Sequence, residues 1–157
     1  ADLNALVKDA CALIAHDRQK LRITIELLLS RQPVIARIDP VQIEQVILNL
    51  LRNALDALGD RPDEDRHLLI ETGFSSQGMA FIRVKDNGSG IAAEDLKHLF
   101  DPFFSTKKTG MGMGLSISQT IVAEHNGRIM ADSLKGKGTV FTIELPASSV
   151  IAESIAS

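Results

Sequence analysis

Two glycine clusters in this chain have the composition of loops that bind phosphate. The first, residues 86–90, reads Asp-Asn-Gly-Ser-Gly, and the second, residues 110–115, reads Gly-Met-Gly-Met-Gly-Leu and comes directly before a helical pattern. Glycine lets backbone N–H groups approach an anion, because it lacks a Cβ and adopts positive φ without strain. Amides at a helix N-terminus also favour phosphate. Since the Asp86 carboxylate could accept a hydrogen bond from the exocyclic amine of adenine, the two clusters together predict a nucleotide pocket.

A polar stripe precedes the first cluster, on a segment with helical periodicity. Asn49, Asn53 and Asp56 follow one another at i, i+4 and i+7, so they share one face of a helix. Asparagine is slightly unfavourable inside a helix, and its amide oxygen is a hard ligand that suits Mg²⁺. The stripe therefore predicts part of a magnesium site, while for Asp56 a solvated polar face is an equal alternative.

A phenylalanine-rich segment lies between the two clusters. Residues 100–108 read Phe-Asp-Pro-Phe-Phe-Ser-Thr-Lys-Lys. A phenylalanine pair beside a lysine pair predicts a hinged flap over residues 100–113 that packs down when phosphate arrives at Lys107. Little burial would offset the entropy of ordering the glycine-rich part of this flap in the empty protein. The alternative is that the phenylalanines belong to the core.

Composition and charge exclude several classes of function. The chain has 157 residues, 45% of them hydrophobic, and a formal net charge of −3. These values fit one globular domain that contacts neither nucleic acid nor a membrane surface. Cys11 is the only cysteine, so no internal disulfide can form, and a reducing compartment fits. No apolar run reaches the roughly 18 residues that a membrane span needs.

The segments that must hold these residues follow one another mostly as hairpins. Helices are predicted over residues 2–15, 40–58, 93–99 and 114–125, and strands over residues 21–29, 34–38, 68–74, 79–85, 128–133 and 139–145. Asp39 before Pro40 is a strong signal for a helix start. The expected fold class is α+β: a two-layer α/β sandwich whose mixed, mostly antiparallel sheet is covered on one face by helices. Residues 1–146 would form the domain, and residues 147–157 a flexible C-terminal tail.

The order of the motifs resembles the catalytic, ATP-binding domain of bacterial sensor histidine kinases. The relatives of that domain are the gyrase, MutL and chaperone ATPases, which share the Bergerat fold. Residues 45–54 are similar to the N box, 86–90 to the G1 box, 100–104 to the F box, 110–115 to the G2 box, and 136–139 to a third glycine box. The segments Phe-Phe-Ser-Thr-Lys and Gly-Met-Gly-Met-Gly-Leu-Ser resemble the corresponding segments of kinases of the nitrogen-regulation and oxygen-sensing type.

Position by position, the resemblance implies roles for individual residues. Asn53 would ligate Mg²⁺, Asp86 would bind the adenine amine of ATP, and Asn49 would help to hold the phosphates. Asn49 and Lys107 are the implied catalytic residues, and residues 100–113 would form the ATP lid. The nucleotide-binding residues implied are Asn49, Asn53, Asp86, Gly88, Gly90, Ile91, Phe100, Phe104, Thr106, Lys107, Gly110, Gly112, Met113, Gly114, Leu115 and Thr139.

The resemblance also implies partners outside this chain. No H box is recognisable, since His16 lacks its pattern, so the γ-phosphoryl group would pass to a histidine on a dimerisation domain upstream of residue 1. A response-regulator receiver domain would be the next partner, and the full-length protein would be a homodimer. The expected location is cytoplasmic, with a membrane anchor elsewhere in the protein left open.

Two alternative functions differ from phosphotransfer. One is a self-contained ATPase of the gyrase or chaperone class, and the other is a binding module without catalysis. Asn49 stands where gyrase-type relatives carry a glutamate that activates water, so phosphotransfer is favoured over hydrolysis. The presence of every box argues against a module that has lost ATP.

Overall fold

The computed structural model describes residues 1–59, 65–102 and 114–148. In these ranges the strands form one sheet in the order β1-β2-β3-β5-β4. Its members are β1 (Thr24–Leu28), β2 (His67–Phe74), β3 (Ala80–Asp86), β4 (Arg128–Leu134) and β5 (Gly138–Leu145). Only the β1–β2 pair is parallel among the described strands, and the other neighbours are antiparallel. The predicted mixed, mostly antiparallel sheet is confirmed.

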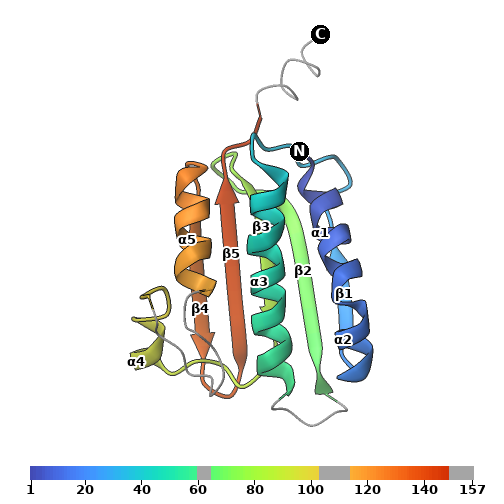
Figure 1. Cartoon of the computed structure of the whole chain (residues 1–157), viewed down its shortest axis with the longest axis vertical. Coiled ribbons are helices and arrows are strands. Elements are labelled where there is room, and N and C mark those ends of the chain that lie inside the picture. Colours follow the sequence, from blue (N-terminus) through green and yellow to red (C-terminus); the bar gives the residue numbers. More distant parts are fainter. Residues whose placement is uncertain (60–64, 103–113, 149–157) are drawn as a thin grey trace.

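The long helices cover one face of this sheet. The helices are α1 (Leu3–Leu13), α2 (Ala15–Lys20), α3 (Pro40–Gly59), α4 (Ala93–Leu96) and α5 (Gly114–Glu124). Figure 1 shows α1, α3 and α5 side by side in front of the strands, with α3 in the middle. The arrangement is the expected two-layer sandwich. None of the helices in the described part of the chain is long and apolar enough to cross a bilayer.

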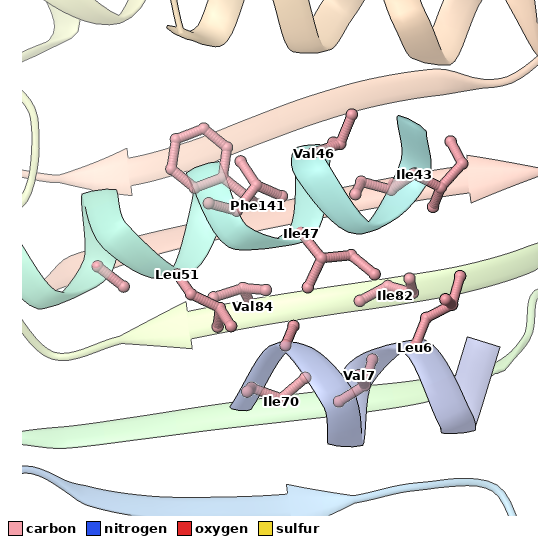
Figure 2. Packing of buried hydrophobic residues seen from close by; sticks show 14 of the residues in the cluster. Leu6, Val7, Ile43, Val46, Ile47, Leu51, Ile70, Ile82, Val84 and Phe141 are labelled. Atoms are coloured by element: carbon pink, nitrogen blue, oxygen red, sulfur yellow. The ribbon is translucent and has the colours of Figure 1, made fainter. Parts of the chain in front are cut away.

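The core lies between α3 and the sheet. Eight apolar residues of α3 are buried at helical spacing: Ile43, Val46, Ile47, Leu50, Leu51, Ala54, Leu55 and Leu58. The strands supply alternate residues to the same core, as a period of two requires, and Figure 2 shows Ile47 and Leu51 of α3 beside Ile82 and Val84 of β3. Each fully buried Ile, Leu or Val side chain among them contributes roughly 1.5–3 kcal/mol. This packing fixes α3, and with it the polar stripe, against the sheet.

The start of α3 is set locally, as predicted. The Oδ1 atom of Asp39 accepts hydrogen bonds from the backbone N–H groups of Val41, at 3.0 Å, and Gln42, at 3.4 Å. These amides have no partner inside the helix, so the side chain satisfies donors that would otherwise be lost. Pro40 occupies the first helical position, where a missing N–H does no harm.

The strand predicted over residues 34–38 is wrong. This segment makes only isolated bridges, Asp2 with Ile35 and Ala36 with Ala147. Val34 and Ala36 are fully buried and Ile35 between them is partly buried, which reflects contact with both ends of the described chain instead of a place in the sheet. Ser148 also donates from its backbone N to the carbonyl of Ile35, at 2.9 Å. Residues 149–157 of the expected tail lie outside the described residues.

Three boundaries also differ from the prediction. The first helix ends at Leu13, and α2 occupies residues 15–20, which the sequence pattern assigns to the end of that helix and to a loop. Arg22 has a φ of 55°, which a helix and a strand both exclude, so β1 begins only at Thr24. Helix α4 is shorter than predicted and ends at Leu96.

Candidate functional site

The described candidate residues come together where α3 passes the end of β3 and the start of β5. Asp86 is the last residue of β3 and pairs with Thr139 near the start of β5. A Cβ built on Gly88 would lie 2.8 Å from the Cβ of Ala57, which places the first glycine cluster against α3. A Cβ on Gly114 would lie 2.6 Å from Oδ1 of Asn49, which places the start of α5 against the polar stripe. Four segments that are distant in the sequence thus border one region.

Asp86 has the properties of a buried ligand-binding carboxylate. Its residue is only 4% exposed, and its Oδ1 accepts a hydrogen bond from the N–H of Gly88 at 2.8 Å. Burial raises the pKa of the Asp86 carboxyl to about 6, and backbone hydrogen bonds from Gly88 and Thr139 limit the rise. At neutral pH the group is therefore ionised and accepts hydrogen bonds only. A buried carboxylate that stays ionised despite the free-energy cost of its burial marks a candidate binding site.

The glycines of the first cluster serve close packing as well as loop geometry. Gly90 has a φ of +73°, and a Cβ there would lie 2.1 Å from the carbonyl oxygen of Leu134. Gly138 has a φ of +107°, and a Cβ there would lie 2.1 Å from the carbonyl oxygen of Asp86. At both positions a side chain is disfavoured for two reasons: the backbone has a positive φ, and a Cβ would collide with a backbone oxygen. The loop after β3 is therefore pressed against the β4–β5 turn.

Ser133 of β4 joins these segments through its hydroxyl. Its Oγ accepts a hydrogen bond from the N–H of Ile91 at 2.7 Å and donates to the carbonyl oxygen of Gly138 at 2.8 Å. It also lies 2.9 Å from Oγ1 of Thr139. Ile91 and Thr139 are both candidate nucleotide-binding residues, and Ser133 connects them. Sequence reasoning missed Ser133, although a small hydroxyl residue opposite a glycine turn is a usable signal.

Asn49 is held by α5. Its Nδ2 donates to Oγ of Ser118 at 3.1 Å, and Ser118 is only 2% exposed. Asn53, one turn further along α3, is half-buried, and Asp56 is exposed. Ser118 was also missed in the sequence, where its signal is a polar residue four positions before the buried Val122, on the same face of α5.

The second glycine cluster and the flap are described only at their ends. Phe100 and Leu115 are partly buried against the hydrophobic core, which agrees with the core alternative for Phe100. The remaining candidates, Phe104, Thr106, Lys107, Gly110, Gly112 and Met113, lie outside the described residues. The predicted flap therefore stays a prediction.

Comparison with known proteins gives one consistent relationship. Residues 38–149 match the sequence family described as histidine kinase-, DNA gyrase B-, and HSP90-like ATPase. The chain is 37% identical over 147 residues to the sensor histidine kinase ZraS of Klebsiella oxytoca. It is 36% identical over 146 residues to the sensor protein FixL of Bradyrhizobium diazoefficiens. These alignments cover 92% and 93% of this chain but 30% and 28% of the two relatives.

Solved structures give the same relationship for the fold. The catalytic domain of the histidine kinase ThkA superposes with a TM-score of 0.81 at 29% identity, covering 93% of both chains. ThkA in complex with the response regulator TrrA superposes with a TM-score of 0.78 at 27% identity, covering 94% of this chain and 41% of that one. The α/β architecture of this chain is thus that of a histidine kinase catalytic domain.

Proposed function

The chain belongs to the family of histidine kinase-, DNA gyrase B- and HSP90-like ATPases, and we propose that it is the unit of a two-component sensor kinase that binds Mg-ATP and donates its γ-phosphoryl group to a histidine. The chain spans less than a third of the curated relatives quoted above, so the acceptor histidine and the partners belong to this proposal. The observation that carries it is the buried Asp86 carboxylate beside Thr139, bordered by α3 and the start of α5.

In this proposal the adenine ring enters between α3 and the loop after β3. Asp86 accepts a hydrogen bond from the exocyclic amine, because an ionised carboxylate offers only acceptors. The loop after β3 contains Gly88, Gly90 and Ile91. The hydrogen bond from the Ile91 N–H to Ser133 holds that loop in place. The low exposure of Asp86 supports this role, since a charge-assisted hydrogen bond is strongest where water is excluded.

The phosphates lie toward α5 in this arrangement. The N-terminus of α5 at Gly114 faces Asn49, and the unpaired amides of a first helical turn favour negative charge. Lys107, outside the described residues, is proposed to contact the β- and γ-phosphates together with the amides of Gly112 to Leu115.

Mg²⁺ fits the donor set on α3. Asn49 and Asn53 are half-buried amides on one helical face beside the start of α5, and amide oxygens are hard ligands of the kind this ion takes. Asn53 is proposed as the ligand and Asn49 as a contact to the phosphates. Bound Mg²⁺ would neutralise charge on the phosphate oxygens.

The reaction proposed is transfer and not hydrolysis. The bond between the γ-phosphorus and the β-phosphate oxygen breaks, ADP leaves, and a ring nitrogen of the acceptor histidine bonds to phosphorus. Residues 1–146 supply positioning and charge stabilisation for this step. An amide at position 49 cannot take a proton from water, so the chain offers no carboxylate base there.

The partners proposed follow from the kinship. The acceptor histidine lies on a phosphoacceptor and dimerisation domain of the same protein, within a homodimer. A receiver domain of a response regulator accepts the phosphoryl group next, and the complex of the relative ThkA with the response regulator TrrA supports such a partner. Because ATP is a cytoplasmic substrate, we place this unit in the cytoplasm.

Two measurements test the proposal. Calorimetric titration of the chain with a non-hydrolysable ATP analogue should show binding that is tighter with Mg²⁺ than without it. Incubation with γ-labelled ATP should leave the chain unlabelled and label a separately purified phosphoacceptor domain in acid-labile form. Absence of nucleotide binding, or acid-labile label on His16 of the chain alone, would contradict the proposal.

A further inference from the structure

Three polar side chains form a row across three strands at the end of the adenine site. Ser133 of β4 pairs with Thr139 of β5, and Thr139 pairs with Asp86 of β3. Directly opposed residues of neighbouring strands point to the same face, so these side chains stand next to one another. Asp86 and Thr139 are each 4% exposed, and Ser133 is partly buried. The row is thus a local hydrogen-bonding unit.

The contacts of Ser133 fix the direction of each hydrogen bond. The N–H of Ile91 can only donate, so Ser133 Oγ accepts at 2.7 Å. The carbonyl oxygen of Gly138 can only accept, so the single hydroxyl hydrogen of Ser133 points to it at 2.8 Å. Ser133 then has no hydrogen left for Thr139, whose Oγ1 lies 2.9 Å away. The Thr139 hydroxyl is therefore the donor in that contact.

This end of the proposed adenine site therefore offers only hydrogen-bond acceptors to a ligand. With its hydrogen committed to Ser133, the Thr139 oxygen has only lone pairs for a ligand. The neighbouring Asp86 carboxylate, when ionised, also only accepts. Facing position 6 of the base, where the proposed function sets Asp86, such a pair favours an amine and disfavours a carbonyl oxygen. The orientation of Thr139, and not only the charge of Asp86, would then contribute to purine selection.

We propose that Ser133 is a specificity-determining positioning residue, which keeps the Thr139 hydroxyl an acceptor toward the base and so favours adenine over 6-oxopurines. The inference rests on the proposed function, because it concerns the base of the bound nucleotide. Ser133 itself acts through Thr139 and need not touch the ligand. Without Ser133, the Thr139 hydroxyl is free to rotate and donate to a carbonyl oxygen at position 6.

The experiment compares ATP with inosine triphosphate, which carries a carbonyl oxygen in place of the amine. Dissociation constants are measured by calorimetric titration with Mg²⁺ for the wild type, Ser133→Ala, Ser133→Thr and the exposed turn variant Ser76→Ala. The ratio of the inosine to the adenosine constants should fall about 3- to 10-fold in Ser133→Ala, the effect of one hydrogen bond. Ser133→Thr retains the hydroxyl and should keep the wild-type ratio, as should Ser76→Ala.

A second variant separates this mechanism from a general loosening of the loop. Thr139→Val removes the hydroxyl with little change of shape. This variant should itself lower the ratio of the inosine to the adenosine dissociation constants. In the Thr139→Val background, Ser133→Ala should change the ratio no further, because its proposed target is gone. An unchanged ratio in folded Ser133→Ala, or a further change in the double variant, overturns the proposal.

The failure of the proposed function has a different signature. A wild-type chain that binds neither triphosphate contradicts the proposed function and the inference together. The inference alone is contradicted if the wild-type chain prefers ATP to inosine triphosphate and the ratio of the two dissociation constants does not change when Ser133 is replaced. If Ser133→Ala does not fold, Thr139→Val carries the test, and an unchanged ratio in that variant overturns the proposal.

Discussion

The side-chain amide of Asn49 on α3 donates from Nδ2 to Oγ of Ser118 on α5, at 3.1 Å. This contact joins residues 69 positions apart in the sequence and connects the two helices that border the proposed phosphate site. Ser118 takes one of the two Nδ2 hydrogens, and both amide atoms lie beside Gly114, with Oδ1 at 2.6 Å and Nδ2 at 3.0 Å from a Cβ built there. The pair therefore fixes the orientation of the Asn49 amide and leaves its second Nδ2 hydrogen for the proposed contact to a phosphate oxygen.

Ser118→Ala should weaken binding of the Mg-ATP analogue. Removal of the hydroxyl leaves the Asn49 amide free to turn, and loss of one hydrogen bond corresponds to about 3- to 10-fold in the dissociation constant. Calorimetric titration gives the value. Thr120→Ala, on the exposed face of the same helix, removes a hydroxyl that bonds only to the carbonyl of Ser116 among the contacts described. Equal effects of the two substitutions would show that Ser118 does not orient Asn49 for binding.

Asp86→Asn should lose nucleotide affinity while gaining stability at pH 8. Burial raises the pKa of this carboxyl from 3.8 to about 6, so the folded state holds the proton more tightly than the unfolded state. The corresponding stabilisation is complete below pH 3.8 and is lost as the pH rises through about 6. At pH 8 the ionised group thus lowers the free energy of unfolding by up to about 3 kcal/mol.

A neutral amide avoids this cost but places a donor opposite the base amine. We therefore expect a higher unfolding midpoint in urea at pH 8, together with an affinity at least about tenfold lower. Asp132→Asn, on a solvent-accessible residue of β4, should change neither value. Lower stability with unchanged affinity would make Asp86 a structural residue.

Nucleotide affinity should depend on the protonation of Asp86. As the pH falls through about 6, the carboxyl gains a proton and loses its acceptor character toward the adenine amine. With that pKa, about one tenth of the groups are ionised at pH 5, so the affinity should fall about tenfold between pH 7.5 and pH 5. The nucleotide itself also titrates in this range, and the same measurement on Asp86→Asn isolates the contribution of the protein. An identical pH profile in both proteins would contradict the assignment.

Asn53→Ala should weaken the binding of Mg-ATP far more than the binding of nucleotide without Mg²⁺. The proposed ligand acts through the ion, which bridges the protein to phosphate oxygens. Titrations with and without Mg²⁺ measure the two constants. The exposed neighbour Arg52 offers a matched control in Arg52→Ala, whose effect should be independent of Mg²⁺. Equal loss in both conditions for Asn53→Ala would assign Asn53 a structural role.

Gly138→Ala should destabilise the domain more than Gly136→Ala. Both glycines have positive φ, of +107° and +85°, but a Cβ at Gly138 would lie 2.1 Å from the carbonyl oxygen of Asp86, whereas Gly136 faces open space. The strain of φ alone costs about 1–2 kcal/mol, and the collision adds to it only at Gly138. Urea unfolding of both variants measures the difference. Equal destabilisation would show that the turn after β4 shifts without cost.

Several features follow from local sequence. The apolar period of α3 and the Asp39-Pro40 start signal predicted that helix within a residue of its observed bounds, because both signals act within a few turns of one helix. The hairpin of β2 and β3 was equally local, with the turn around Gly78 between them. The helical spacing of Asn49, Asn53 and Asp56, and the place of Asp86 before the first glycine cluster, predicted a magnesium and nucleotide site, and this stays a prediction.

Other features depend on the whole fold. The apolar residues over 34–38 fit a strand and a buried connection equally well, and only the isolated bridges to Asp2 and Ala147 distinguished the two. The positive φ of Arg22, which separates α2 from β1, has no counterpart in the composition of that segment.

The sequence by itself determined which residues are apolar and where α3 begins, because these signals act at fixed local spacing, and it predicted which side chains would bind a nucleotide. Only the tertiary structure decided that Ser118 contacts Asn49 and that Ser133, Thr139 and Asp86 form one row. The physical reason is that strand register and helix docking minimise the free energy of packing over the whole core. Which hydroxyl then meets which amide is a consequence of that packing, and no local pattern contains it.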